Sequence, residues 1–112
     1  MPAEEIKSYT IVIYGKDWTV NFVPGIHEKL TKEKYDGLCY YNELAIYISN
    51  DILKKELIRE TLMHELTHAV LCSQGRFHQK RFDAEDMCEF VGWNADLIIE
   101  LADDVMRAAY PD

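Results

Sequence analysis

His64-Glu65-Leu66-Thr67-His68 is the stretch of this 112-residue chain that decides its fold and its chemistry. It has the pattern H-E-x-x-H and lies within a run of helical character, residues 52–72. On a helix, side chains four positions apart lie on one face, one turn above the other. Two imidazoles placed in this way can each turn a ring nitrogen toward one point, at the ~2.0–2.1 Å that zinc requires. The sequence therefore predicts that His64 and His68 bind zinc.

Glu65 is rotated by about 100° from His64 around such a helix, so it flanks the metal without being well placed to bind it. That is where a general base must lie to take a proton from metal-bound water. We expect Glu65 to take this proton as the water attacks a peptide carbonyl, and then to pass it to the leaving amine. The predicted reaction is hydrolysis of a peptide bond, with Glu65 as the catalytic residue.

Composition and charge exclude several classes of protein. The chain is 48% hydrophobic and 29% charged, which is typical of one ordinary globular domain of this length. Its net charge of −8 argues against nucleic acid as the main partner, because phosphate binding needs a basic face. No uncharged apolar stretch of 18 residues is present, so we expect no membrane partner.

The cysteines and the N-terminus predict a cytoplasmic location. Cys39, Cys72 and Cys88 are odd in number and lack the paired spacing of a disulfide framework, which favours a reducing compartment. The first residues have neither the basic start nor the apolar run of a signal peptide. We therefore expect the protein to be cytoplasmic.

The residues before the motif predict a small sheet. Residues 9–14 and 18–23 are rich in β-branched and aromatic side chains, and we expect them to pair as a hairpin. Residues 38–41 and 44–48 predict a second strand pair, whereas residues 26–36 predict a short helical turn or a loop. Ser49-Asn50-Asp51 is a cluster of N-cap residues, so we expect the motif helix to begin directly after it.

Two helices complete the prediction. The motif helix is apolar on most of its circumference, which predicts burial in the middle of the domain, and Gly75 should end it. A second helix should run from Asp83 to about Ala109, with Pro111 blocking its continuation. The expected fold class is α+β, a single domain over residues 1–112 in which a small antiparallel or mixed sheet packs on both helices. The apolar stripe of the second helix has spacings of three and four: Ala84, Met87, Cys88, Val91, Ala95, Ile98, Ala102 and Val105.

The third zinc ligand should come from this second helix, because a catalytic zinc usually has three protein ligands and one open position. Glu85 and Glu89 are four residues apart and share a face, whereas Asp86 points about 100° away from Glu85. Periodicity therefore favours Glu85 or Glu89 as the ligand but does not rank these two.

At these residues the chain resembles the gluzincin-type zinc peptidases, and more closely the small ImmA/IrrE-type and phage-borne metallopeptidases. Their pattern is H-E-x-x-H, then E-x-x-[small]-[Asn/Asp/Glu] on the next helix, as in residues 64–68 and 85–89 here. The resemblance implies a minimal zincin-like fold, Glu85 as the third zinc ligand and Glu89 as the support of a ligand histidine. It also implies that a protein or peptide substrate docks along Leu44–Ile48 as an edge strand, and that this substrate is a regulator such as a repressor.

Several residues and two other functions remain open at this point. His78 is the first candidate for a donor to the developing oxyanion, and Tyr40, Tyr41 and Arg81 are weaker candidates. Cys72 lies one turn beyond His68, and we favour a buried apolar thiol over a metal ligand there. The alternatives are a zincin-fold binding module that does not cut its partner, and a structural zinc protein. The latter would need a fourth ligand from Cys72 or His78.

Overall fold

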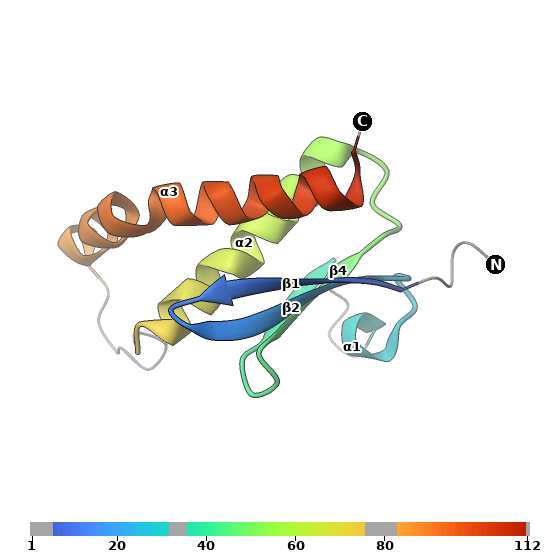
Figure 1. Cartoon of the computed structure of the whole chain (residues 1–112), viewed down its shortest axis with the longest axis horizontal. Helices are drawn as coiled ribbons and strands as arrows, with labels where there is room; N and C mark the ends of the chain where they lie inside the picture. The colour runs from blue at the N-terminus through green and yellow to red at the C-terminus, as the bar shows by residue number, and fades with distance from the viewer. Residues whose placement is uncertain (1–5, 32–35, 76–82, 112) are drawn as a thin grey trace.

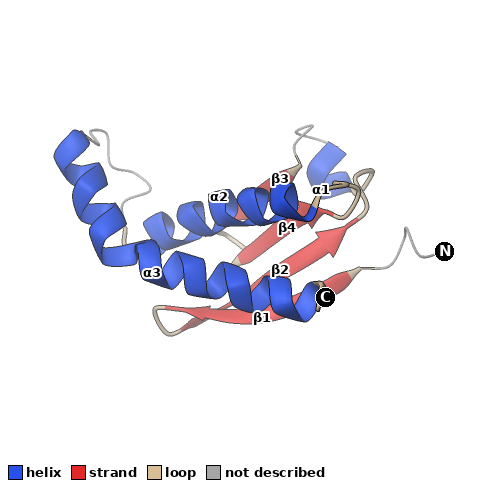
Figure 2. Cartoon of the chain, turned by 90° about the horizontal axis from the view of Figure 1, so that it is seen from above, coloured by secondary structure: helices blue, strands red, loops and turns tan. Residues whose placement is uncertain are grey.

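The computed structural model describes residues 6–31, 36–75 and 83–111 (Figure 1). Helices α2 and α3 cover one face of a four-stranded mixed sheet, which confirms the predicted α+β class (Figure 2). In these residues no helix is both long enough and apolar enough to cross a membrane. The elements, in chain order, are β1 (Lys7–Ile13), β2 (Lys16–Val23), α1 (Glu28–Thr31), β3 (Gly37–Tyr40), β4 (Ala45–Ser49), α2 (Lys55–Ser73) and α3 (Ala84–Ala109).

The sheet has the strand order β1-β2-β4-β3. The two predicted strand pairs are confirmed, because β1 pairs with β2 and β3 pairs with β4, both antiparallel. The pairs are joined by a parallel contact between β2 and β4, in which Val20 lies opposite Ile46. Strand β4 is therefore an inner strand, and β1 and β3 form the two edges.

The core lies between the sheet and the two helices. Trp18, Val20 and Phe22 share the helix side of β2, because side chains alternate along a strand, and all three are almost fully buried. Leu62 and Leu66 of α2 are fully buried against this layer. Burial of such side chains contributes about 1.5–3 kcal/mol each, so this layer fixes the face that α2 turns toward the sheet.

The start of α2 differs from the prediction. The helix begins at Lys55 after Lys54, which makes no side-chain capping bond, so the expected cap at residues 49–51 is wrong. The reason is that these polar side chains have other partners. The Asp51 carboxylate accepts a hydrogen bond from the Gly25 N–H at 2.9 Å, and the Ser49 hydroxyl accepts one from the Asp51 N–H at 3.1 Å. The bond between Asp51 and Gly25 links the residues after β4 to the turn after β2.

The end of α2 and the start of α3 follow the prediction. Gly75 has a positive φ of 75°, and its N–H donates to the Cys72 carbonyl at the end of α2. Asp83 caps α3, because its carboxylate accepts from the Asp86 N–H while the Asp86 carboxylate accepts from the Asp83 N–H.

A polar network holds α3 in place. Asn94, only 1% exposed, accepts hydrogen bonds from the Tyr14 hydroxyl at 2.6 Å and from the Gln74 amide at 3.1 Å. The network joins the β1–β2 turn, the end of α2 and the middle of α3. On the N-terminal side of Asn94, the first part of α3 projects away from α2 and the sheet (Figures 1 and 2).

Candidate metal centre

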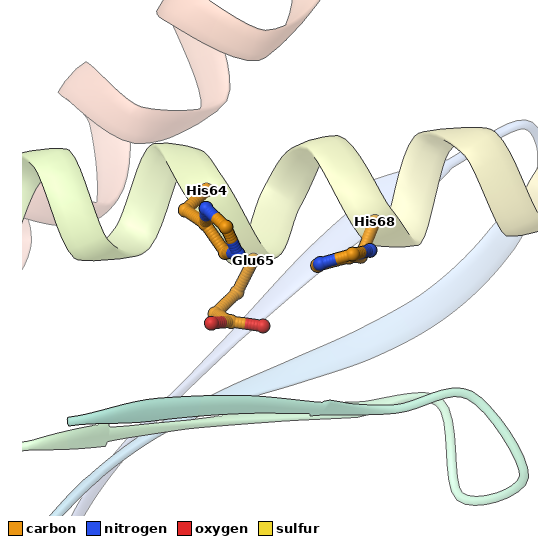
Figure 3. A group of neighbouring side chains, drawn as sticks. All are labelled: His64, Glu65 and His68. Carbon is orange, nitrogen blue, oxygen red and sulfur yellow. The ribbon is translucent and has the colours of Figure 1, made fainter. Parts of the chain in front are cut away.

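His64, Glu65 and His68 lie together on the side of α2 that faces β3 (Figure 3). Each offers one ligand atom, and these three atoms lie within 4.8 Å of one another. The imidazole ring centroids of His64 and His68 are 4.9 Å apart. Both histidines are exposed, whereas Glu65 is only 7% exposed and projects toward the strands. The helical spacing of the motif therefore produces the predicted cluster.

The cluster opens into a pocket of about 350 Å³ between α2 and β3. This volume lies within the range of ordinary ligand pockets. Helix α2 supplies one wall, and β3 with the following turn supplies the other. The lining residues are Gly37, Leu38, Cys39, Tyr41, His64, Glu65, His68 and Cys72.

The electrostatics of the pocket suit a divalent metal ion. Burial lowers the pKa of His68, and His64 adds to this effect, so His68 is mainly neutral at pH 7 and keeps a ring nitrogen available to a metal. Burial raises the pKa of Glu65, and His64 partly opposes this change. Two imidazoles beside a carboxylate are nitrogen and oxygen donors of the kind that zinc takes in proteins, so the residues fit this metal.

Gly37 allows β3 to pass close to Glu65. A Cβ atom at this position would lie 2.7 Å from Thr61 Cγ2 and 3.2 Å from Glu65 Oε2. Any side chain here would press against the helix beside the carboxylate, so glycine sets the spacing between β3 and α2. Sequence reasoning missed Gly37, although a glycine within a strand often marks a close approach of another part of the chain.

The structure places Glu85 and Glu89 away from this cluster. Both are exposed, and neither joins the group of potential ligands found among the described residues. At 100° per residue, they project from the side of α3 opposite its buried Phe90 and Ile98. The role of Glu85 as a zinc ligand stays a prediction, and it requires the start of α3 to approach α2. Asp86 is occupied in the helix cap.

The other predicted residues divide into three groups. Tyr41 lines the pocket, whereas Tyr40 lies on the opposite face of the sheet, where Lys29 Nζ is 4.2 Å from its ring centroid. Cys72 is only partly buried and lines the pocket, so it is not the enclosed core thiol that we expected. His78 and Arg81 lie outside the described residues.

Cys39 is a pocket residue that sequence reasoning missed. Burial, with smaller contributions from Glu65 and Cys72, raises its pKa to about 12. The thiol therefore stays protonated at neutral pH. The sequence pattern that could have identified it is the alternation of side chains along β3, which places Gly37 and Cys39 on the same face of the strand.

The expectation that Leu44–Ile48 is an edge strand is wrong. Strand β4 is hydrogen-bonded to β2 on one side and to β3 on the other, so its backbone has no free edge. The edge strand that lines the pocket is β3. The physical reason is the parallel pairing of β2 with β4, which turns the second hairpin so that its first strand lies outermost.

An H-E-x-x-H helix packed on a small mixed sheet defines a metallopeptidase-like α+β domain. Comparison with protein families gives the family: the sequence model of the SprT-like family matches residues 16–95, well over half of the chain. The chain belongs to the SprT-like family, a zinc metallopeptidase-like family with a zincin-like fold. This confirms the expected relation to zinc metallopeptidases with a zincin-like fold, whereas the gluzincin type and the closer resemblance to ImmA/IrrE-type proteins stay predictions. Searches of curated proteins and of solved structures gave no match.

Proposed function

We propose that the chain is a zinc-dependent endopeptidase that hydrolyses a peptide bond in a protein partner. The observation that carries the proposal is the grouping of His64, Glu65 and His68 in a pocket walled by an edge strand. In this proposal His64 and His68 hold zinc, with Glu85 as the third ligand. When bound, zinc supplies Lewis-acid activation of water and of the substrate carbonyl.

Glu65 is the proposed general base. Its carboxylate accepts a proton from the attacking water and delivers it to the nitrogen of the leaving amine. Burial raises its pKa, which suits a group that must both accept and return a proton. The neighbouring backbone of Gly37 restricts the space around the carboxylate and so helps to fix its position.

The proposed docking site for an extended substrate is the edge of β3. An edge strand offers free backbone groups, and a guest segment can pair with them as an added strand. A segment docked along residues 37–39 of β3 would run past Glu65 and both histidines, because all of these border the same pocket. Tyr41, at the end of this wall, is the proposed hydrogen-bond donor to the carbonyl oxygen.

The partner class in this proposal comes from the sequence resemblance alone. The ImmA/IrrE-type proteins imply a transcriptional regulator as the substrate, in a cytoplasmic setting. Cleavage of a folded regulator would require an exposed extended loop, because β3 can pair only with an unpaired strand.

The substitution Glu65→Gln tests the proposed function. It is nearly isosteric and removes the capacity to accept a proton, so zinc binding should persist while hydrolysis falls by at least about 100-fold. The assay is cleavage of fluorescently labelled unfolded casein by the zinc-loaded chain, with Glu28→Gln on the other face of the sheet as the matched control. Equal rates for Glu65→Gln and the wild type would refute the assignment of the base. A zinc-loaded wild type that cuts neither casein nor an extended peptide library would instead support the non-catalytic binding module.

A further inference from the structure

A second depression lies between α2 and α3, apart from the metal pocket. It is an apolar groove of about 310 Å³, and none of its lining residues lines the metal pocket. Met87, Val91 and Ile99 border it while remaining 56%, 52% and 41% exposed. The groove residues are Met63, Thr67, Leu71, Met87, Phe90, Val91, Ala95, Ile98 and Ile99.

The sequence of α3 makes this exposure unusual. Its apolar stripe runs without a break from Ala84 to Val105, as expected for a helix that is covered along its whole length. The described part of the chain buries the second half of the stripe, including Ile98 and Val105, but leaves Met87 and Val91 more than half exposed. An apolar surface of this kind on a soluble fold marks a site for a partner.

The lining of the groove carries no charge, but helical spacing places acidic side chains next to it, and these form its rim. Glu56 and Glu60 extend the line of Met63 and Thr67 along α2 at helical spacing, and all four lie on one side of that helix. Asp96 lies one turn from Ile99 on α3. Glu56, Glu60 and Asp96 have no ion pair within the described ranges.

The rest of α3 adds to this negative charge. The nearby Arg59 is already paired with Asp103 at 3.0 Å, so it does not neutralise the rim. Arg107 is the sole basic residue of α3. Apart from Asp103, the helix also carries the exposed carboxylates of Glu85, Asp96, Glu100 and Asp104.

We propose that this groove binds a basic amphipathic helix of a protein partner. The walls are side chains of two helices whose backbone groups are bonded within each helix, so they offer no backbone partner to an extended segment. A helix satisfies its own backbone and can lay an apolar face between Val91 and Leu71, with lysine or arginine side chains against the acidic rim. A second copy of this chain is a poor occupant, because its net charge of −8 would bring like charges together.

The groove lies beside the metal pocket around α2. Leu71 follows His64 by seven residues, which is two turns further along nearly the same side of the helix. A partner held in the groove would therefore be kept near the pocket, which raises its effective concentration there. Docking itself uses neither zinc nor Glu65, so this inference goes beyond the proposed function. It is tested on the metal-free chain, because zinc binding by Glu85 would bring the start of α3, which forms one wall of the groove, closer to α2.

The test uses the full chain and a fluorescein-labelled 18-residue helical peptide of leucine and lysine. Binding is followed by anisotropy in about 0.1 M salt. Val91→Gln should weaken binding by about tenfold, since a half-exposed apolar side chain at the groove would lose its contact. The matched control is Trp93→Gln, because Trp93 is 72% exposed and projects from another side of α3. It should leave the affinity unchanged. Circular dichroism confirms that both variants fold.

Further experiments test the role of the acidic rim and the location of the docking site. Replacing Glu60 and Asp96 by their amides should weaken binding several-fold and flatten its salt dependence. A leucine–glutamate peptide with the same apolar positions should bind at least tenfold more weakly. Hydrogen exchange with bound peptide gives the location. Protection of backbone amides on the outer face of the sheet, or a loss of affinity with Trp93→Gln equal to that with Val91→Gln, would overturn the proposal. Self-association of the chain that Val91→Gln abolishes would overturn it too, since a second copy would then be the occupant.

Discussion

Gly37→Ala is the substitution that most sharply tests the architecture of the pocket. The added methyl would lie 2.7 Å from Thr61 Cγ2, about 1 Å closer than the 3.5–4.0 Å of a favourable carbon–carbon contact. Overpacking of this kind costs about 1–3 kcal/mol, and alanine returns about 0.4–1 kcal/mol by restricting the unfolded chain. We expect a net loss of about 1–2 kcal/mol in the free energy of unfolding.

The same methyl would lie 3.2 Å from Glu65 Oε2 and should displace the proposed base. A misplacement of about 1 Å in a catalytic group can lower the rate on the order of 100-fold. We expect kcat for casein cleavage to fall by about 10–100-fold, more than the change in stability alone would cause. Urea denaturation measures the stability, and cleavage by the folded fraction measures kcat.

Two further variants separate these effects. Thr61→Ser, combined with Gly37→Ala, removes the methyl that makes the 2.7 Å contact and should restore most of the stability, but only part of the activity. Gly92→Ala is the matched control, because a Cβ atom there meets nothing within 4 Å, and it should stabilise α3 by roughly 0.5–1 kcal/mol. If Gly37→Ala is as stable and as active as the wild type, β3 does not pass this close to Glu65 and our description of the pocket is wrong.

Three other predictions concern the ligands, the base and the thiols. In zinc titrations, Glu85→Ala should empty the site while Glu89→Ala weakens affinity by about 10–100-fold, and the reverse order would exchange their roles. Because burial raises the pKa of Glu65, the stability linked to its neutral form is complete below its ordinary value of ~4.3 and is lost as pH rises through the raised value. Glu65→Gln should therefore stabilise the metal-free chain at pH 7 and lose this advantage near pH 4, as chemical denaturation would show. At pH 8, iodoacetamide should modify the exposed Cys88 and spare Cys39, whose pKa is about 12, and mass spectrometry of the peptides would detect the opposite pattern.

The parts of the fold that depend on local spacing could be predicted from the sequence. The H-E-x-x-H spacing placed His64 and His68 on one face of α2, and alternation placed Trp18, Val20 and Phe22 on one face of β2, which is the buried face. Both hairpins followed from short turns between β-forming segments. Each of these features is set by residues close together in the chain.

The missed features depend on contacts between distant segments. The order of the strands follows from the parallel pairing of β2 with β4, which no local sequence pattern predicts. Because of this pairing, β3 rather than β4 is the edge strand. The rotation of α3 was missed for a related reason. Its buried face includes Asn94, a polar residue that hydrophobic periodicity passes over and that is held by Tyr14 and Gln74. This rotation leaves Glu85 exposed, and its role as the third zinc ligand stays a prediction.

Zinc-edge anomalous diffraction from crystals of the zinc-loaded chain tests the central claim most directly. We predict one zinc peak, within ~2.0–2.1 Å of a ring nitrogen of both His64 and His68, beside Glu65 and facing β3. The same map would show whether Glu85 completes the ligand set. A zinc peak away from these two histidines, or none in a folded and zinc-saturated crystal, would contradict the account.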